Sequence, residues 1–119
     1  MPHLDGPMFH PTISTISLGS HTVINFYKPA EEDGDSMVFD DRLVTSLLVK
    51  PRSLLILKND MYHKYLHGIE EIHEDVLSDK ICNLKDPSVI GQTFPRSTRV
   101  SLTIRHVPNT KKMKFKFGK

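Results

Sequence analysis

The chain has 119 residues, which is enough for one domain and too few for two. Hydrophobic residues make up 38% and charged residues 25%, and the net charge is only +2, so the composition does not suggest global disorder. No apolar run approaches the roughly 20 residues that a membrane-spanning helix needs. Cys82 is the single cysteine, which rules out an internal disulfide and fits a reducing, intracellular compartment.

Short apolar segments bounded by turn residues run along most of the chain. They predict strands over 12–18, 22–27, 45–50, 53–58 and 99–106, and an exposed acidic loop over 28–36. The unbroken run from Leu54 to Leu57 predicts a strand that is buried on both faces. Many short strands with Gly and Pro turns indicate an all-β sandwich or jelly roll.

The second half of the chain has a less regular pattern. Asn59 and Asp60 predict the cap of a short helix that runs to about Leu66, and an extended segment follows at 67–69. Residues 76–84 allow a short strand or a helix. The tripeptide His73-Glu74-Asp75 could bind an ion, but a solvated charged turn explains it more simply.

The tripeptide His3-Leu4-Asp5 places an imidazole and a carboxylate two residues apart. In an extended segment such residues share a face, so both side chains can bind one metal ion. With the distant His67 they would form the two-histidine, one-carboxylate set typical of non-haem Fe(II) oxygenases. Taken alone, the tripeptide is explained more simply by a solvated terminal histidine and aspartate.

The segment 99–105 carries an arginine at each end. On a strand, Arg99, Ser101, Thr103 and Arg105 share one face, because side chains alternate between the two sides. Two interpretations follow. The strand could be half-exposed with a polar outer face, or it could form a cationic wall inside a barrel that holds a dicarboxylate such as 2-oxoglutarate.

The order of these motifs resembles the AlkB family of Fe(II)- and 2-oxoglutarate-dependent dioxygenases, closest to the AlkB homologue 6 branch. The segments 2–7, 15–22, 51–55, 65–69 and 99–105 carry the resemblance. It spans about residues 2–108, which would be the C-terminal portion of the dioxygenase domain, and residues 109–119 form a basic tail. The resemblance implies a double-stranded β-helix, or jelly roll, that is incomplete at its N-terminus and has a short helix before His67.

The resemblance also implies a ligand set. His3, Asp5 and His67 would bind the iron, and no catalytic residue is expected beyond them. Arg99 would bind the distal carboxylate of 2-oxoglutarate and Arg105 would lie near its keto-acid end. Ser101 and Thr103 could add minor contacts.

The implied activity is oxidative demethylation of alkylated DNA or RNA with Fe(II), 2-oxoglutarate and O2 as cofactors, in the nucleus or the cytoplasm. Two alternatives stay open: a truncated, non-catalytic binding protein, and a dioxygenase that acts on protein. Because the family has further β-structure before the His-x-Asp motif, we expect this chain alone to be marginally stable and to turn over little or no substrate. The alternating lysines and phenylalanines of the tail could contact nucleic acid or serve only solubility.

Overall fold

Strands make up most of the part of the molecule that the computed structural model describes, residues 12–29 and 42–105. In chain order the elements are β1 (Thr12–Gly19), β2 (Thr22–Tyr27), β3 (Leu43–Val49), β4 (Ser53–Lys58), helix α1 (Asp60–His63), β5 (Leu66–Gly68), β6 (Glu74–Val76), the 3-10 helix η2 (Pro87–Val89), β7 (Thr93–Pro95) and β8 (Arg99–Arg105). The all-β prediction is therefore confirmed.

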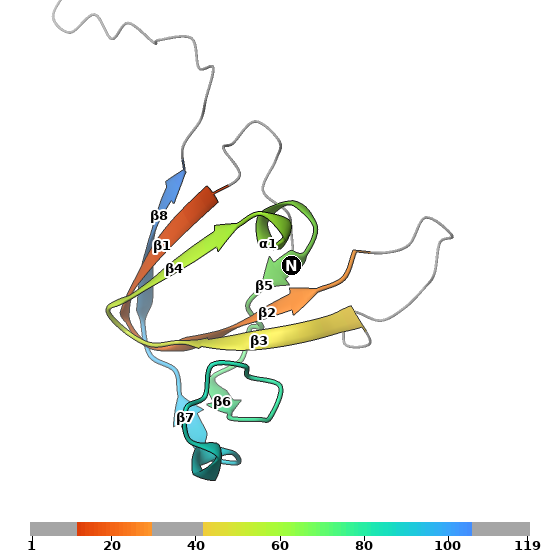
Figure 1. Cartoon of the computed structure of the whole chain (residues 1–119). Helices are drawn as coiled ribbons and strands as arrows, with labels where there is room; N and C mark the ends of the chain where they lie inside the picture. Colours follow the sequence, from red (N-terminus) through yellow and green to blue (C-terminus); the bar gives the residue numbers. More distant parts are fainter. Residues whose placement is uncertain (1–11, 30–41, 106–119) are drawn as a thin grey trace, which may run out of the picture.

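Two three-stranded antiparallel sheets form the body of the fold. One has the strand order β4-β1-β8 and the other β3-β2-β5, and β6 and β7 pair separately. The chain passes from one sheet to the other between β1 and β2 and again between β3 and β4. Both crossings lie at the same end, so the sheets meet there and diverge like the arms of a V (Figure 1). This arrangement is jelly-roll-like, as expected.

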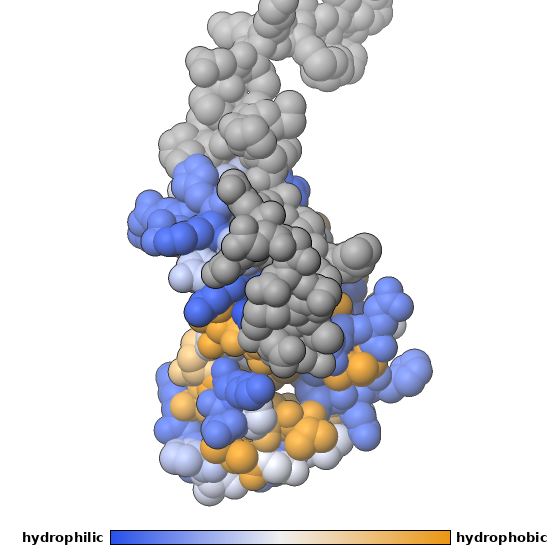
Figure 2. Space-filling model, turned by 90° about the vertical axis from the view of Figure 1, so that its right-hand side faces the viewer, coloured by the Kyte–Doolittle hydropathy of each residue, from blue (hydrophilic) through white to orange (hydrophobic). Residues whose placement is uncertain are grey.

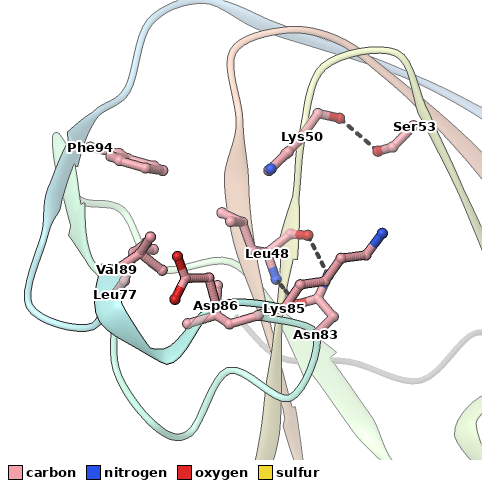
Figure 3. Close-up of a pocket in the computed structure, with 10 residues that line it drawn as sticks. Leu48, Lys50, Ser53, Leu77, Asn83, Lys85, Asp86, Val89 and Phe94 are labelled. Atoms are coloured by element: carbon pink, nitrogen blue, oxygen red, sulfur yellow. Dashed lines mark hydrogen bonds between the residues drawn. The ribbon is translucent and has the colours of Figure 1, made fainter.

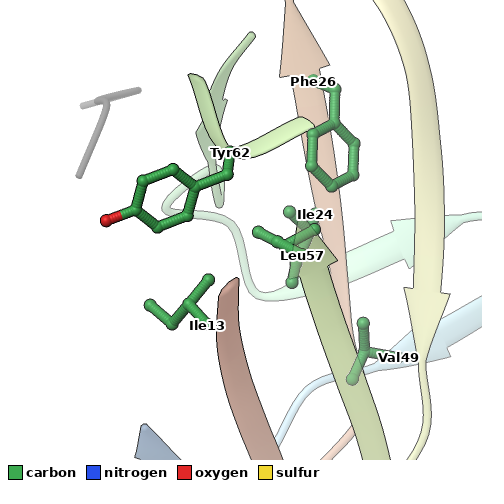
Figure 4. Packing of buried hydrophobic residues seen from close by; sticks show 6 residues of the cluster. All are labelled: Ile13, Ile24, Phe26, Val49, Leu57 and Tyr62. Carbon is green, nitrogen blue, oxygen red and sulfur yellow. The ribbon is translucent and has the colours of Figure 1, made fainter. Parts of the chain in front are cut away.

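The core lies between the two sheets. Six buried residues from β1, β2, β3, β4 and α1 gather there (Figure 4): Ile13, Ile24, Phe26, Val49, Leu57 and Tyr62. In a second cluster, Leu48 of β3 packs against Leu77 and Ile81 of the segment between β6 and β7. Because Leu48 and Val49 are neighbours on one strand, they serve opposite faces of the β3-β2-β5 sheet.

The prediction that β4 is buried on both faces is wrong. Leu57 is 8% exposed, but Leu54 is 58% and Ile56 50% exposed. Leu54 and Leu102 both pair with Ile16 on β1, so they flank this residue on the outer face of the sheet. The outer face is apolar, but no part of the described chain covers it. Other hydrophobic patches lie among hydrophilic residues on the face shown in Figure 2.

The predicted helix is shorter than expected, and its predicted cap is absent. Helix α1 ends at His63, and Asn59 makes no side-chain cap hydrogen bond. Asn59 has a φ of 57°, outside the extended region in which an N-cap side chain can reach the first turn. Its carbonyl oxygen instead accepts from the backbone N–H groups of Tyr62 and His63. The ambiguous stretch 76–84 holds only the end of β6 and a parallel bridge from Ile81 to Ser46.

Candidate functional site

A cleft of about 260 Å³ opens between the two sheets. Strands β1, β4 and β8 supply one wall, and β2, β5 and the residue after β5 supply the other. It is lined by Ile13, Thr15, Ile24, Leu55, Leu57, His67, Gly68, Ile69, Arg99, Ser101, Thr103 and Arg105. Every residue within the described part of the chain that was predicted to bind the metal or 2-oxoglutarate is among them: His67, Arg99, Ser101, Thr103 and Arg105.

The register between β1 and β8 explains why the polar face of β8 lines this cleft. Thr15 pairs with Thr103, and Ile13, which belongs to the core, pairs with Arg105. Paired residues point to the same side of a sheet, so the alternate residues of β8 share the inner side. Val100, Leu102 and Ile104 take the outer side. The polar face of β8 therefore lies on the cleft side of the sheet, although Ser101, Thr103 and Arg105 are exposed to solvent there.

Arg99 is held in the cleft wall by a hydrogen bond from its side chain. Its Nη2 donates a 2.7 Å hydrogen bond to Oγ of Ser17, which is fully buried. Its Nε is buried and has no hydrogen-bond partner among residues 12–29 and 42–105. Burial lowers the pKa of Arg99, and the nearby positive charge of Arg96 lowers this pKa further. A partly desolvated guanidinium with an unused donor is suited to binding an anion.

The start of β8 is held by the turn between β1 and β2. The backbone N–H of Ser20 donates to the carbonyl oxygen of Thr98 at 3.0 Å, and Oγ of Ser20 accepts from the N–H of Ser97 at 2.9 Å. Gly19 has a φ of 86°, and a Cβ at this position would lie 2.3 Å from the Thr98 oxygen. A glycine is required there, because any side chain would push Thr98, and with it Arg99, out of place.

His67 approaches the cleft from the opposite wall. It pairs with Phe26 in the middle of β5, and the two ring centroids lie 6.3 Å apart. The side chain is half-buried, between a core aromatic residue and the cleft. The structure thus brings His67 to the same cleft as Arg99 and Arg105. The roles of these three residues stay predictions.

Two of the three predicted metal ligands, His3 and Asp5, lie outside the described residues. Within 12–29 and 42–105 no group of three or more metal-ligating side chains occurs. His67 is therefore the one predicted ligand whose surroundings are visible. His63 is exposed, and it packs edge-to-face against Tyr62 rather than in the cleft.

A buried ion pair was missed by the sequence analysis. Asp75 was expected in a solvated turn, but it is 4% exposed. Both of its carboxylate oxygens accept from Arg96, at 2.6 and 2.7 Å, and Oδ2 also lies 2.9 Å from Nε2 of His21. These partners are 21 and 54 residues away along the chain. No local spacing signals such a contact, because only the folded chain brings the three residues together.

A larger cavity, of about 420 Å³, lies outside β3 and is separate from the cleft (Figure 3). Its floor is mostly apolar, with Leu48, Leu77, Val89 and Phe94. The carboxamide of Asn83 in its wall is already paired with both the N–H and the carbonyl oxygen of Leu48, each at 2.8 Å. The smaller cleft, by contrast, is lined by a histidine and two arginines, and it is therefore the candidate site.

Comparison with known proteins identifies relatives of the whole chain. The chain is 51% identical over 123 aligned residues, all of its length, to a Danio rerio protein named "Probable RNA/DNA demethylase ALKBH6". The chain belongs to the AlkB family. It is also 29% identical, over 89% of its length, to "Uncharacterized protein L905" of Acanthamoeba polyphaga mimivirus. No protein-family model matches the chain.

This AlkB-family chain spans about half the length of the curated relatives it matches: 52% of the Danio rerio protein and 41% of the mimivirus protein. In the described ranges, no helix is both long enough and apolar enough to cross a membrane.

Proposed function

We propose that this chain carries the 2-oxoglutarate- and iron-binding part of an AlkB-type dioxygenase that demethylates alkylated nucleic acid. The proposal rests on one observation: Arg99, which lines the same cleft as His67, is anchored to buried Ser17 and has a buried Nε donor without a partner among residues 12–29 and 42–105. The name of the Danio rerio relative, an RNA/DNA demethylase, supports a nucleic-acid substrate.

The residues of the cleft fit a small dicarboxylate. Arg99 would bind its distal carboxylate through its guanidinium group, because charge-assisted hydrogen bonds to a guanidinium are strong and directional. The hydroxyls of Ser101 and Thr103 lie on the same face and can donate to carboxylate oxygens. The apolar side chains of Leu55 and Leu57 on the neighbouring strand would exclude water from the carbon chain between the carboxylates.

His67, together with His3 and Asp5, would hold the metal at the other end of this ligand. When bound, iron would activate O2, which is the oxidant, and 2-oxoglutarate would supply two electrons as it is converted to succinate and carbon dioxide. The protein's part is to fix the cosubstrate between Arg99 and His67, with Arg105 contributing positive charge to the same wall. That charge would also favour the approach of an anionic nucleic-acid strand.

The binding of 2-oxoglutarate in the presence of Mn²⁺, measured by calorimetry, tests the anchor without turnover. Arg99→Ala should weaken binding at least tenfold, because truncating a residue bonded to a charged ligand costs about 1.5–3 kcal/mol. Arg99→Lys should also weaken it, since one ammonium cannot replace the guanidinium fork. Lys80→Ala, which removes an exposed charge away from the cleft, is the matched control. Unchanged affinity in the Arg99→Ala variant would place the anchor elsewhere.

Succinate formation on methylated oligonucleotides tests the reaction itself. Turnover that depends on both Arg99 and a methylated base would support demethylation. Binding of 2-oxoglutarate without succinate formation, while a longer form of the protein is active, would instead support the non-catalytic alternative for this chain.

A further inference from the structure

We propose that Arg96 is a positioning residue that holds the His67 segment and the Arg99 segment at a fixed separation. This role rests on the proposed function, because it concerns the two ends of the proposed cosubstrate site. Arg96 does not line the cleft itself.

The contacts of Arg96 connect three parts of the chain. Its Nη1 donates to the carbonyl oxygen of Glu70 at 2.7 Å, three residues after His67. Its Nε and Nη2 donate to the two carboxylate oxygens of Asp75 in β6. Arg96 itself lies three residues before Arg99 on the same segment, and its backbone N–H donates to the carbonyl oxygen of His73 at 2.8 Å. One guanidinium therefore ties both site-bearing segments to β6.

Asp75 also connects this ion pair to His21, the residue directly before β2. His21 follows directly on the turn residue Ser20. Ser20 in turn bonds to Ser97 and Thr98, between Arg96 and Arg99. The arrangement is closed: from Arg96 through Asp75 and His21 back to the backbone beside Arg96. A closed set of bonds resists displacement better than single contacts, because no member can move without breaking two of them.

The pair is buried enough to hold its geometry. The side chains of Asp75 and Arg96 are 5% and 14% exposed, so water competes little for their hydrogen bonds. The carboxylate raises the pKa of Arg96, which keeps the guanidinium charged. All three donor nitrogens of Arg96 that make bonds point to different acceptor atoms. A lysine at this position would keep the charge but could not reach Glu70 and both Asp75 oxygens together.

The test combines two measurements on Arg96→Ala and Arg96→Lys. Hydrogen exchange should rise in both 66–72 and 97–101 in each variant, without any cosubstrate present. The dissociation constant for 2-oxoglutarate should rise about 10–100-fold, as for other residues that orient ligand-binding groups. Lys80→Ala controls for lost charge, and Ile81→Ala, in the other core cluster, controls for lost stability. In both controls the dissociation constant for 2-oxoglutarate should stay within about twofold of the wild-type value.

The outcomes separate the two proposals. Normal affinity in the Arg96→Lys variant, or exchange that rises in only one of the two segments, would overturn the positioning role. Equal loss of affinity in the Ile81→Ala variant would reduce Arg96 to a general contribution to stability and overturn it too. A wild-type protein that binds no 2-oxoglutarate, but whose two segments loosen together in the Arg96→Lys variant, would refute the proposed function and leave the coupling intact. If the Arg96→Ala variant does not fold, the Arg96→Lys variant decides.

Discussion

Replacing Gly19 with alanine should be among the most damaging single-methyl changes in this chain. Two glycines, Gly19 and Gly91, have positive φ angles of 86° and 94°. Either alanine would pay the cost of an unfavourable backbone conformation, about 1–2 kcal/mol. Only at Gly19 does the new Cβ also collide, 2.3 Å from the carbonyl oxygen of Thr98, whereas at Gly91 nothing lies within 4 Å.

The collision at Gly19 is with backbone, which cannot rotate away as a side chain would. Relieving such an overlap costs about 1–3 kcal/mol in addition. We therefore expect Gly19→Ala to lose about 2–5 kcal/mol of unfolding free energy and Gly91→Ala about 1–2 kcal/mol. Because Gly19 pairs with Arg99, the first change should also weaken 2-oxoglutarate binding, and the second should not.

Urea unfolding followed by circular dichroism measures the two losses under the same conditions. The difference between the variants is the critical quantity, since the backbone cost is common to both. Equal losses would show that the Thr98 segment moves freely and that the turn between β1 and β2 does not hold Arg99. A large loss of stability with normal 2-oxoglutarate affinity would separate the turn from the site.

Two further changes test the packing and the electrostatics. Leu57→Ala should lower the unfolding free energy by about 2–5 kcal/mol because this side chain is 8% exposed, whereas Leu54→Ala, at 58% exposed, should cost about 1 kcal/mol or less; similar losses in urea titrations would refute the assignment of inner and outer faces. Hydrogen bonds from Ser88 lower the pKa of Asp86 in the folded state; the larger effect comes from the backbone N–H of Ser88 and the smaller one from its side chain. Its contribution to stability is therefore present at neutral pH and is lost as the pH falls through the lowered pKa. Asp86→Ala should reduce stability at pH 7, and the difference from the wild type should shrink below about pH 4; a difference that is independent of pH would show that the charge has no part in it.

The sequence by itself determined the local structure of most strands. β2 and β4 begin and end where the alternating apolar residues and the flanking turn residues predict, because strand formation there needs only neighbouring residues. The common face of Arg99 and Arg105 follows from the same period of two. The order of the motifs along the chain was sufficient to indicate the family, whereas no single motif would have indicated it.

Only the tertiary structure decided which face of each strand is buried and which distant residues meet. The run from Leu54 to Leu57 reads the same whether one or both faces are covered, because coverage depends on what packs above and below the sheet. The sequence of β8 likewise did not show which side of the sheet its two arginines occupy; its register with β1 places them on the cleft side. Asp75 has its two partners, His21 and Arg96, only because β2, β6 and the segment before β8 converge. Burial and long-range ion pairs belong to the packed chain, and a sequence pattern reports only the periodicity of its own segment.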